Sequence, residues 1–217
     1  LEHHANIVPW QRACQRFGAE LTVLPINNAG ELDSGDFARY LDGVKIFSAA
    51  LVSNALGTIN DLAPLIAEAK ARGIHTIVDA AQAVAHLPCD VQALGCDFLV
   101  FSAHKIYGPT GIGVLYGRHD LLDAMPPYQT GGDMILSVSF EHTHYAAAPQ
   151  KFEAGTPPIV EVIGLGAALD WVTDKGLTNL ATHEETLRQA AEQALTALPG
   201  LRIIGTARHK AAVISFT

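Results

Sequence analysis

Apolar residues recur along the chain in two patterns, one typical of buried strands and one typical of helices. Continuous apolar runs of strand length predict strands at residues 21–26, 44–52, 74–78, 98–101 and 113–116. Apolar residues at helical spacing, several of them closed by glycine, predict helices at residues 9–18, 34–41, 61–72, 160–174 and 178–198. Two further short strands are expected at residues 201–204 and 213–216.

Strands that are apolar on both faces and alternate with helices predict an α/β fold. Its expected architecture is a three-layer, mainly parallel sheet with helices on both faces. Residues 126–158 break the pattern, because they are rich in Gly, Pro, Thr and His and show little periodicity. An irregular segment of that length is usually functional or contacts another chain. A domain boundary near residue 172 would give a large domain at 1–171 and the beginning of a small α+β domain at 172–217.

Composition and charge exclude several classes of protein. The 217 residues are 49% hydrophobic and 17% charged, which is too apolar for a disordered chain. The net charge of −8 argues against nucleic acid and anionic membranes as partners. The longest apolar run, residues 162–169, is far shorter than the roughly 20 residues of a membrane span.

The three cysteines, Cys14, Cys89 and Cys96, show no CxxC spacing. Neither a disulfide framework nor a zinc ribbon is predicted, and a reducing, cytoplasmic location fits best. Cys14 and Cys96 have the pattern of small core residues, and nothing near Cys89 marks it as activated. His142 and His144 form an H-x-H pair, but no cysteine or carboxylate cluster accompanies them, so we predict no metal site.

Polar residues follow three successive predicted strands. They are Ser53-Asn54, Asp79 and the run from Ser102 to Lys105. In an open α/β sheet, ligands bind beyond the carboxyl ends of the strands, so these groups are expected to converge on one site.

Asp79 and Lys105 each have an ordinary interpretation. Asp79 taken alone is a turn or cap residue, and Lys105 taken alone is a solvated surface group. Together they suggest chemistry, because a partly buried lysine amine becomes nucleophilic toward a carbonyl. Pyridoxal phosphate (PLP) requires such a lysine, and a carboxylate that keeps its ring nitrogen protonated. Ser102 and His104 would then be donors to the phosphate.

Two other features have weaker interpretations. His3 and His4 are either surface histidines or, for one of them, a ring that lies above a cofactor. The glycine-rich run at residues 108–113 lacks the GK[ST] ending of a P-loop and precedes a strand, whereas a P-loop follows one. We interpret it as a tight turn behind the lysine.

Six motifs, in order along almost the whole chain, resemble those of the class V aminotransferases, which are fold-type I PLP enzymes. The closest resemblance is to the cysteine desulfurase and selenocysteine lyase branch. The motifs lie at residues 2–10 (EHHANIVPW), 52–58 (VSNALGT), 79–83 (DAAQA), 102–105 (SAHK), 107–113 (YGPTGIG) and 152–157 (FEAGTP).

The resemblance implies catalytic and cofactor-binding roles. Lys105 corresponds to the lysine that binds PLP covalently and removes the substrate's α-proton. Asp79 corresponds to the partner of the pyridine nitrogen. His3 matches the ring that stacks on the cofactor and handles protons.

Further cofactor contacts are implied in the same way. Gln82 matches the donor to the ring hydroxyl, and Asn54 lies near the substrate side of the ring. Ser102 and His104 correspond to phosphate donors. Thr156 corresponds to a phosphate ligand that the neighbouring subunit of a homodimer supplies.

Four positions depart from the family's pattern. Ala80 and Ala103 stand where glycine is usual, and we expect little effect unless the backbone there needs a positive φ. Pro158 and Thr130 are also unusual, which puts local loop geometry in question.

The resemblance implies a PLP-dependent cysteine desulfurase that converts L-cysteine to L-alanine and an enzyme persulfide. It also implies a homodimer, a sulfur-acceptor protein and a role in iron–sulfur cluster assembly. The alternatives are another class V enzyme (a selenocysteine lyase, a kynureninase-like lyase or an amino-acid epimerase) and a non-catalytic scaffold for sulfur carriers.

The ends of the chain suggest a segment of a longer protein. The sequence starts at Leu1 without Met and stops at Thr217 in a predicted strand. The family's persulfide-forming cysteine and carboxylate-binding arginine are expected beyond Thr217, so the fragment alone is expected to be inactive.

Overall fold

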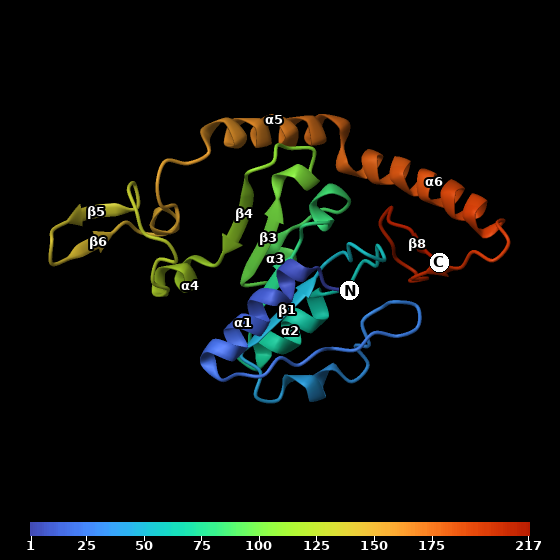
Figure 1. Ribbon diagram of the computed structural model, residues 1–217, viewed down its shortest axis with the longest axis horizontal. Coiled ribbons are helices and arrows are strands. Elements are labelled where there is room, and N and C mark those ends of the chain that lie inside the picture. Colours follow the sequence, from blue (N-terminus) through green and yellow to red (C-terminus); the bar gives the residue numbers. More distant parts are fainter.

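The computed structural model describes residues 1–217 and centres on a four-stranded sheet (Figure 1). The strands lie in the order β1 (Ile46–Ala50), β2 (His75–Asp79), β3 (Phe98–Ser102) and β4 (Gly113–Gly117). The first three are parallel and β4 is antiparallel to β3. The predicted α/β fold with a mainly parallel sheet is therefore confirmed.

Helices and short 3-10 turns connect these strands. The α-helices are α1 (Val8–Phe17), α2 (Ala63–Ala71), α3 (Val91–Leu94), α4 (His119–Ala124), α5 (Ile159–Lys175) and α6 (Leu177–Thr196). The 3-10 turns are η1 (His4–Asn6), η2 (Phe37–Leu41), η3 (Ala83–Ala85), η4 (Ala103–Lys105) and η5 (Gln150–Phe152). None of the helices is both long enough and apolar enough to cross a membrane.

Two small antiparallel pairs lie at opposite ends of the molecule (Figure 1). One is the hairpin of β5 (Ile135–Val138) and β6 (Thr143–Tyr145), and the other joins β7 (Ile203–Ile204) to β8 (Ser215–Phe216). Between them, α5 runs across the ends of β3 and β4, and α6 continues toward the C-terminus.

Helix α2 illustrates how the apolar pattern builds the core. The face predicted from its spacing is buried, and it consists of Leu62 beside the helix and Leu65, Ile66 and Ala69 within it. Each large aliphatic side chain buried in this way contributes about 1.5–3 kcal/mol. The helix ends before Gly73, whose φ of 73° suits glycine better than other residues.

Two predicted elements near the N-terminus were wrong. Residues 21–26 form no strand, and only Ile26 makes an isolated bridge, to Leu32. Pro25 has no N–H to donate to a ladder, and Val23 is 74% exposed, so this apolar run is not buried by a sheet neighbour. The helix predicted at 34–41 is the 3-10 turn η2, preceded by Asp36 and without a side-chain cap from Ser34.

The segment 126–158 was predicted to be irregular, but it contains the β5–β6 hairpin. Both of its faces are largely exposed, as the side chains of Leu136, Val138 and Tyr145 illustrate. A strand that is not packed on a core lacks the apolar alternation from which strands are predicted.

The segment that ends at β8 packs on the turn after β1. Ile59 N donates to His209 O at 2.9 Å, and Ala211 N donates to Gly57 O at 2.8 Å. Gly57 has a φ of 72°, and a Cβ atom there would lie 2.9 Å from Ala211 O, so only glycine fits. The turn that holds Asn54 is thus shaped by residues far from it in the sequence.

The domain boundary near residue 172 stays a prediction. Helix α5 runs without a break through Val172, whose side chain is buried in the same core cluster as the sheet.

Candidate functional site

Three segments with polar residues leave the sheet at one edge, which we call the carboxyl edge: residues 53–54, 79–82 and 102–105. The register places Asp79 between Ala50 of β1 and Val100 of β3. Backbone bonds continue this alignment, because Leu51 N donates to Asp79 O and Ala80 N donates to Val100 O, both at 2.9 Å. The parallel strands therefore bring the three segments to the same side of the molecule.

The carboxylate of Asp79 is held at the end of β2. Its Oδ1 accepts a hydrogen bond from Ala81 N at 2.9 Å, so the turn interpretation of this residue is correct for one oxygen. The other oxygen, Oδ2, accepts no hydrogen bond from the chain. An aspartate fixed by one oxygen and half-buried has the second oxygen available to a ligand.

Lys105 closes the 3-10 turn η4 directly after β3. Ile106 N and Gly108 N both donate to Ala103 O, at 2.9 and 3.0 Å, which fixes the turn. Neither Ala103 nor Ala80 has a positive φ, so alanine is compatible with the backbone at both positions. Residues 108–112, predicted to be a tight turn, form a bend without a turn hydrogen bond of their own and lead into β4 at Gly113.

Several polar side chains at the carboxyl edge make no hydrogen bond or ion pair within the chain. They are Asn54, Gln82, Ser102, His104 and Lys105. In the interior of the molecule, by contrast, no buried side-chain nitrogen or oxygen lacks a partner. Next to Asn54, for example, Ser53 is fully buried and its Oγ accepts from Ala55 N and Leu56 N. The carboxyl edge thus combines a free amine, an oriented carboxylate and several free donors.

His3 lies beside this edge through a contact that sequence reasoning missed. Glu2 Oε1 accepts from Ala50 N at 2.8 Å and Glu2 Oε2 accepts from Asn6 Nδ2 at 2.6 Å, which ties the N-terminal segment to the end of β1. His3 is exposed, and its Nδ1 accepts from Ala5 N at 3.1 Å. Thr156 is exposed between η5 and α5, and no hydrogen bond joins it to the other candidates.

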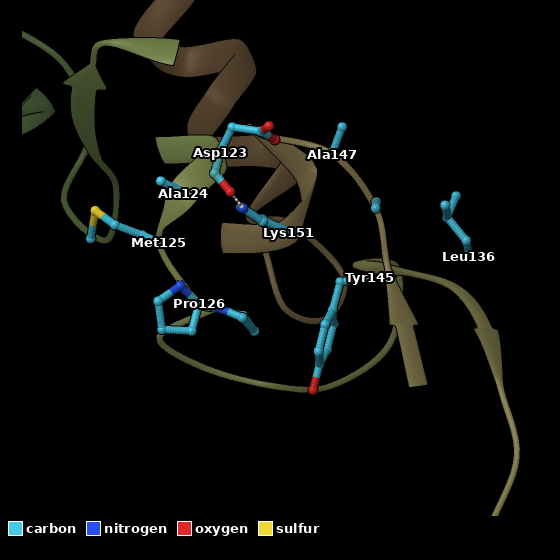
Figure 2. A pocket seen from close by; sticks show the side chains of 10 residues that line it. Asp123, Ala124, Met125, Pro126, Leu136, Tyr145, Ala147 and Lys151 are labelled. Atoms are coloured by element: carbon cyan, nitrogen blue, oxygen red, sulfur yellow. Dashed lines mark hydrogen bonds between the residues drawn. The ribbon is translucent and has the colours of Figure 1, made fainter. Parts of the chain in front are cut away.

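An open hollow of about 670 Å³ lies elsewhere, between α4 and the hairpin (Figure 2). None of the predicted site residues lines it. Lys151 is nearly buried beside it, and its Nζ donates to Asp123 O at 2.6 Å, so this amine is already occupied. Met125, Leu136 and Tyr145 give the hollow an apolar lining.

Cys89 and Cys96 are not activated. All three cysteines are free, and burial raises the pKa of Cys89 to about 11 and also raises that of Cys96. A thiol is nucleophilic as its thiolate, so neither residue is poised to react near neutral pH.

Comparison with known proteins identifies the family. The model of the family "Aminotransferase class-V" matches residues 1–217. The chain belongs to this family. The resemblance that the six motifs indicated is therefore confirmed, and the family's match covers the candidate site.

The relatives include cysteine desulfurases. The one from Klebsiella pneumoniae strain 342 is 54% identical, over all of this chain and 53% of the relative; the one from Synechococcus elongatus is 52% identical, over 35% of the relative. A solved cysteine desulfurase from Thermococcus onnurineus has a TM-score of 0.95 at 37% identity, and one from Escherichia coli has 0.91 at 41%. All of this chain aligns with each structure, but it covers only 55% of the Thermococcus chain and 54% of the Escherichia coli chain. It therefore spans about half their length.

Proposed function

We propose that this chain is the cofactor-binding part of a PLP-dependent cysteine desulfurase, which converts L-cysteine to L-alanine and an enzyme persulfide. The observation that carries the proposal is that Lys105 and Asp79 both follow strands that end at the carboxyl edge. Both residues lie in motifs of a chain that is about half identical to curated cysteine desulfurases.

The residues at the carboxyl edge fit PLP. A lysine amine without a partner suits the aldehyde of the cofactor, and the free oxygen of Asp79 suits its pyridinium nitrogen. The hydroxyl of Ser102 and the ring of His104 are unpaired donors beside the lysine, as an anionic phosphate requires. When bound, PLP supplies an electron sink that stabilises a carbanion at the substrate's Cα.

The chain's own groups would then position the reactants and move protons. Lys105 would hold the aldehyde until the substrate's own amine displaces it, and its free Nζ would then take the α-proton. The carboxylate of Asp79 would keep the ring nitrogen charged. The hydrogen bond from Ala81 N already orients the Asp79 carboxylate, so no free energy is spent on orienting it during the reaction. The remaining proposed contacts are made by His3 against the ring face, Gln82 at the ring hydroxyl, Asn54 toward the substrate, and Ser102, His104 and Thr156 at the phosphate.

We also propose a homodimer that shares its sites, a sulfur-acceptor protein and a role in iron–sulfur cluster assembly. The exposed apolar side chains of the hairpin region, among them Tyr128, Leu136 and Phe140, favour contact with a second subunit. Free cysteines fit a reducing, cytoplasmic compartment. The cysteine that receives sulfur and the arginine that binds the substrate carboxylate would come from outside this chain.

The test is to purify the protein that carries these residues, add PLP, and record the visible absorption band together with alanine and sulfide release from L-cysteine. Lys105→Ala is expected to lose the band and the activity. Lys175→Ala, which removes an exposed lysine far along α5, is the matched control and should retain both. A band that persists unchanged in Lys105→Ala contradicts the proposal.

The substrate panel separates the alternatives. Release of selenide from selenocysteine without sulfide from cysteine would indicate a selenocysteine lyase. Cleavage of kynurenine, or inversion of an amino acid without loss of its side chain, would indicate the other class V reactions. Failure of the protein to bind PLP would favour the scaffold.

A further inference from the structure

One carboxylate on α6 joins two turns of the candidate site. Glu184 Oε2 lies 2.6 Å from His86 Nδ1, and Tyr107 Oη donates to Glu184 Oε1 at 3.4 Å. His86 closes η3, the turn that begins after Gln82, and Tyr107 comes two residues after Lys105. Glu184 therefore bridges the segments that follow β2 and β3.

The arm that reaches Tyr107 is held in an unusual conformation. Tyr107 has a φ of 62°, a left-handed value that is uncommon for a bulky residue and persists only where the surroundings impose it. Its ring packs on Trp171 of α5 with the ring centroids 5.0 Å apart. Burial and the neighbouring Glu184 carboxylate raise the pKa of the Tyr107 hydroxyl, so it stays a hydrogen-bond donor at neutral pH.

The arm that reaches His86 is shielded from solvent. The side chains of His86 and Glu184 are 16% and 24% exposed. A short contact to a carboxylate in such surroundings is stronger than a pair at the surface, where such pairs contribute little. The same helix offers a contrast in Glu185, whose carboxylate pairs with Arg188 within α6 and reaches neither turn.

We infer that Glu184 is a positioning residue that sets the spacing between the Gln82 turn and the Lys105 turn of the PLP site. This inference rests on the proposed function. Glu184 touches neither Gln82 nor Lys105, and it acts through His86 and Tyr107. Nothing in the sequence marks it, because glutamate on a polar helix is the commonest of surface residues.

The test compares Glu184→Gln and Glu184→Ala with Glu185→Gln, which removes the same charge from the next residue. A titration followed by the absorption band measures PLP affinity. Circular dichroism in that band reports the environment of the bound cofactor, and thermal unfolding reports the stability of the fold. Glu184→Ala is expected to weaken PLP binding about tenfold and to change the dichroism of the band. Glu184→Asp should recover part of the affinity, and Glu185→Gln should leave both readouts unchanged.

Tyr107→Phe separates the two arms, since it removes the hydroxyl and keeps the ring on Trp171. It is expected to weaken PLP binding about threefold, and to have no further effect when Glu184 is already Ala. If Glu184→Ala does not fold, Tyr107→Phe on its own still tests one of the two contacts of Glu184. Additive effects of the two substitutions would contradict the inference.

The outcomes distinguish this inference from the proposed function. If the unsubstituted protein binds no PLP, the proposed function fails and the inference fails with it. If it binds PLP through Lys105 and the Glu184 variants keep the affinity and the dichroism while their unfolding temperature falls, only the inference is overturned.

Discussion

The two edges of the central sheet differ in how far their charged side chains are paired within the protein. At the carboxyl edge, the carboxylate of Asp79 has one oxygen without a partner, and Lys105 has no ion pair. At the opposite edge, which we call the amino edge, Asp97 is 2% exposed and fully paired. Its Oδ2 accepts from Thr76 N at 2.9 Å, and its Oδ1 lies 3.1 Å from Arg118 Nη1 and 3.4 Å from Lys70 Nζ.

The pKa of Asp97 reflects this pairing. Burial alone would raise it, but the hydrogen bonds from Thr76 and Arg118 and the charge of Lys70 outweigh burial, so the pKa lies below its ordinary value of 3.8. A carboxylate saturated by the protein stabilises the fold and has nothing left for a ligand. Polar groups left without partners at the other edge are free to bind one, so the same strands serve stability at one end and chemistry at the other.

The largest expected effect is at the carboxyl edge, with Asp79→Asn. The amide can still accept the hydrogen bond from Ala81 N, but it carries no charge to hold a protonated ring nitrogen. Desulfuration of cysteine should fall about 1,000-fold. The free energy of unfolding should change by less than about 1 kcal/mol. Asp61→Asn, at an exposed aspartate before α2, is the control, and equal losses of activity in both variants would refute the role of Asp79.

The complementary substitution at the amino edge is Asp97→Asn. It leaves Lys70 and Arg118 without their buried counter-charge, and we expect a loss of about 3 kcal/mol in the free energy of unfolding, measured with urea. PLP affinity of the folded protein should be unchanged. Asp120→Asn removes the exposed partner of Arg118 and should cost less than about 1 kcal/mol. A loss of PLP affinity in Asp97→Asn would remove the distinction between the edges.

Acid should erase the difference between the unsubstituted protein and Asp97→Asn. Folding lowers the pKa of Asp97, so its ionised carboxylate stabilises the folded state at any pH above the ordinary pKa of 3.8. This stabilisation is lost as the pH falls through the lowered pKa. Urea unfolding should show a constant difference from roughly pH 5 to 8 that shrinks below about pH 4. A difference that grows in acid would contradict the lowered pKa.

The smallest effect is expected at Cys89, which belongs to neither edge. With a pKa of about 11 its thiolate fraction near neutral pH is about 100-fold below that of an ordinary thiol. Iodoacetamide should label Cys89 slowly in the native protein and quickly in urea, as mass spectrometry can show. Cys89→Ser should change desulfuration less than about twofold, and a complete loss would make it a nucleophile after all.

The sequence alone predicted the structure correctly where an apolar pattern repeats or where a strand ends in polar residues. The three parallel strands follow from apolar runs that end in polar residues, and so does the departure of the segments of Asn54, Asp79 and Lys105 from one edge of the sheet. Prediction from the sequence failed where contacts between residues distant in the chain determine the structure. The exposed run at 21–26 has no sheet neighbour, and Glu2 and Glu184 act on segments distant in sequence, so no spacing reveals them.

The close approach of Gly57 to Ala211 has a consequence for the order of events during synthesis. The turn that holds Asn54 leaves the ribosome well before Ala211, the residue that Gly57 contacts. Contacts between such distant segments form slowly, because a long loop must close first. The turn that holds Asn54 should therefore take its final shape only after residues 209–211 have docked on it.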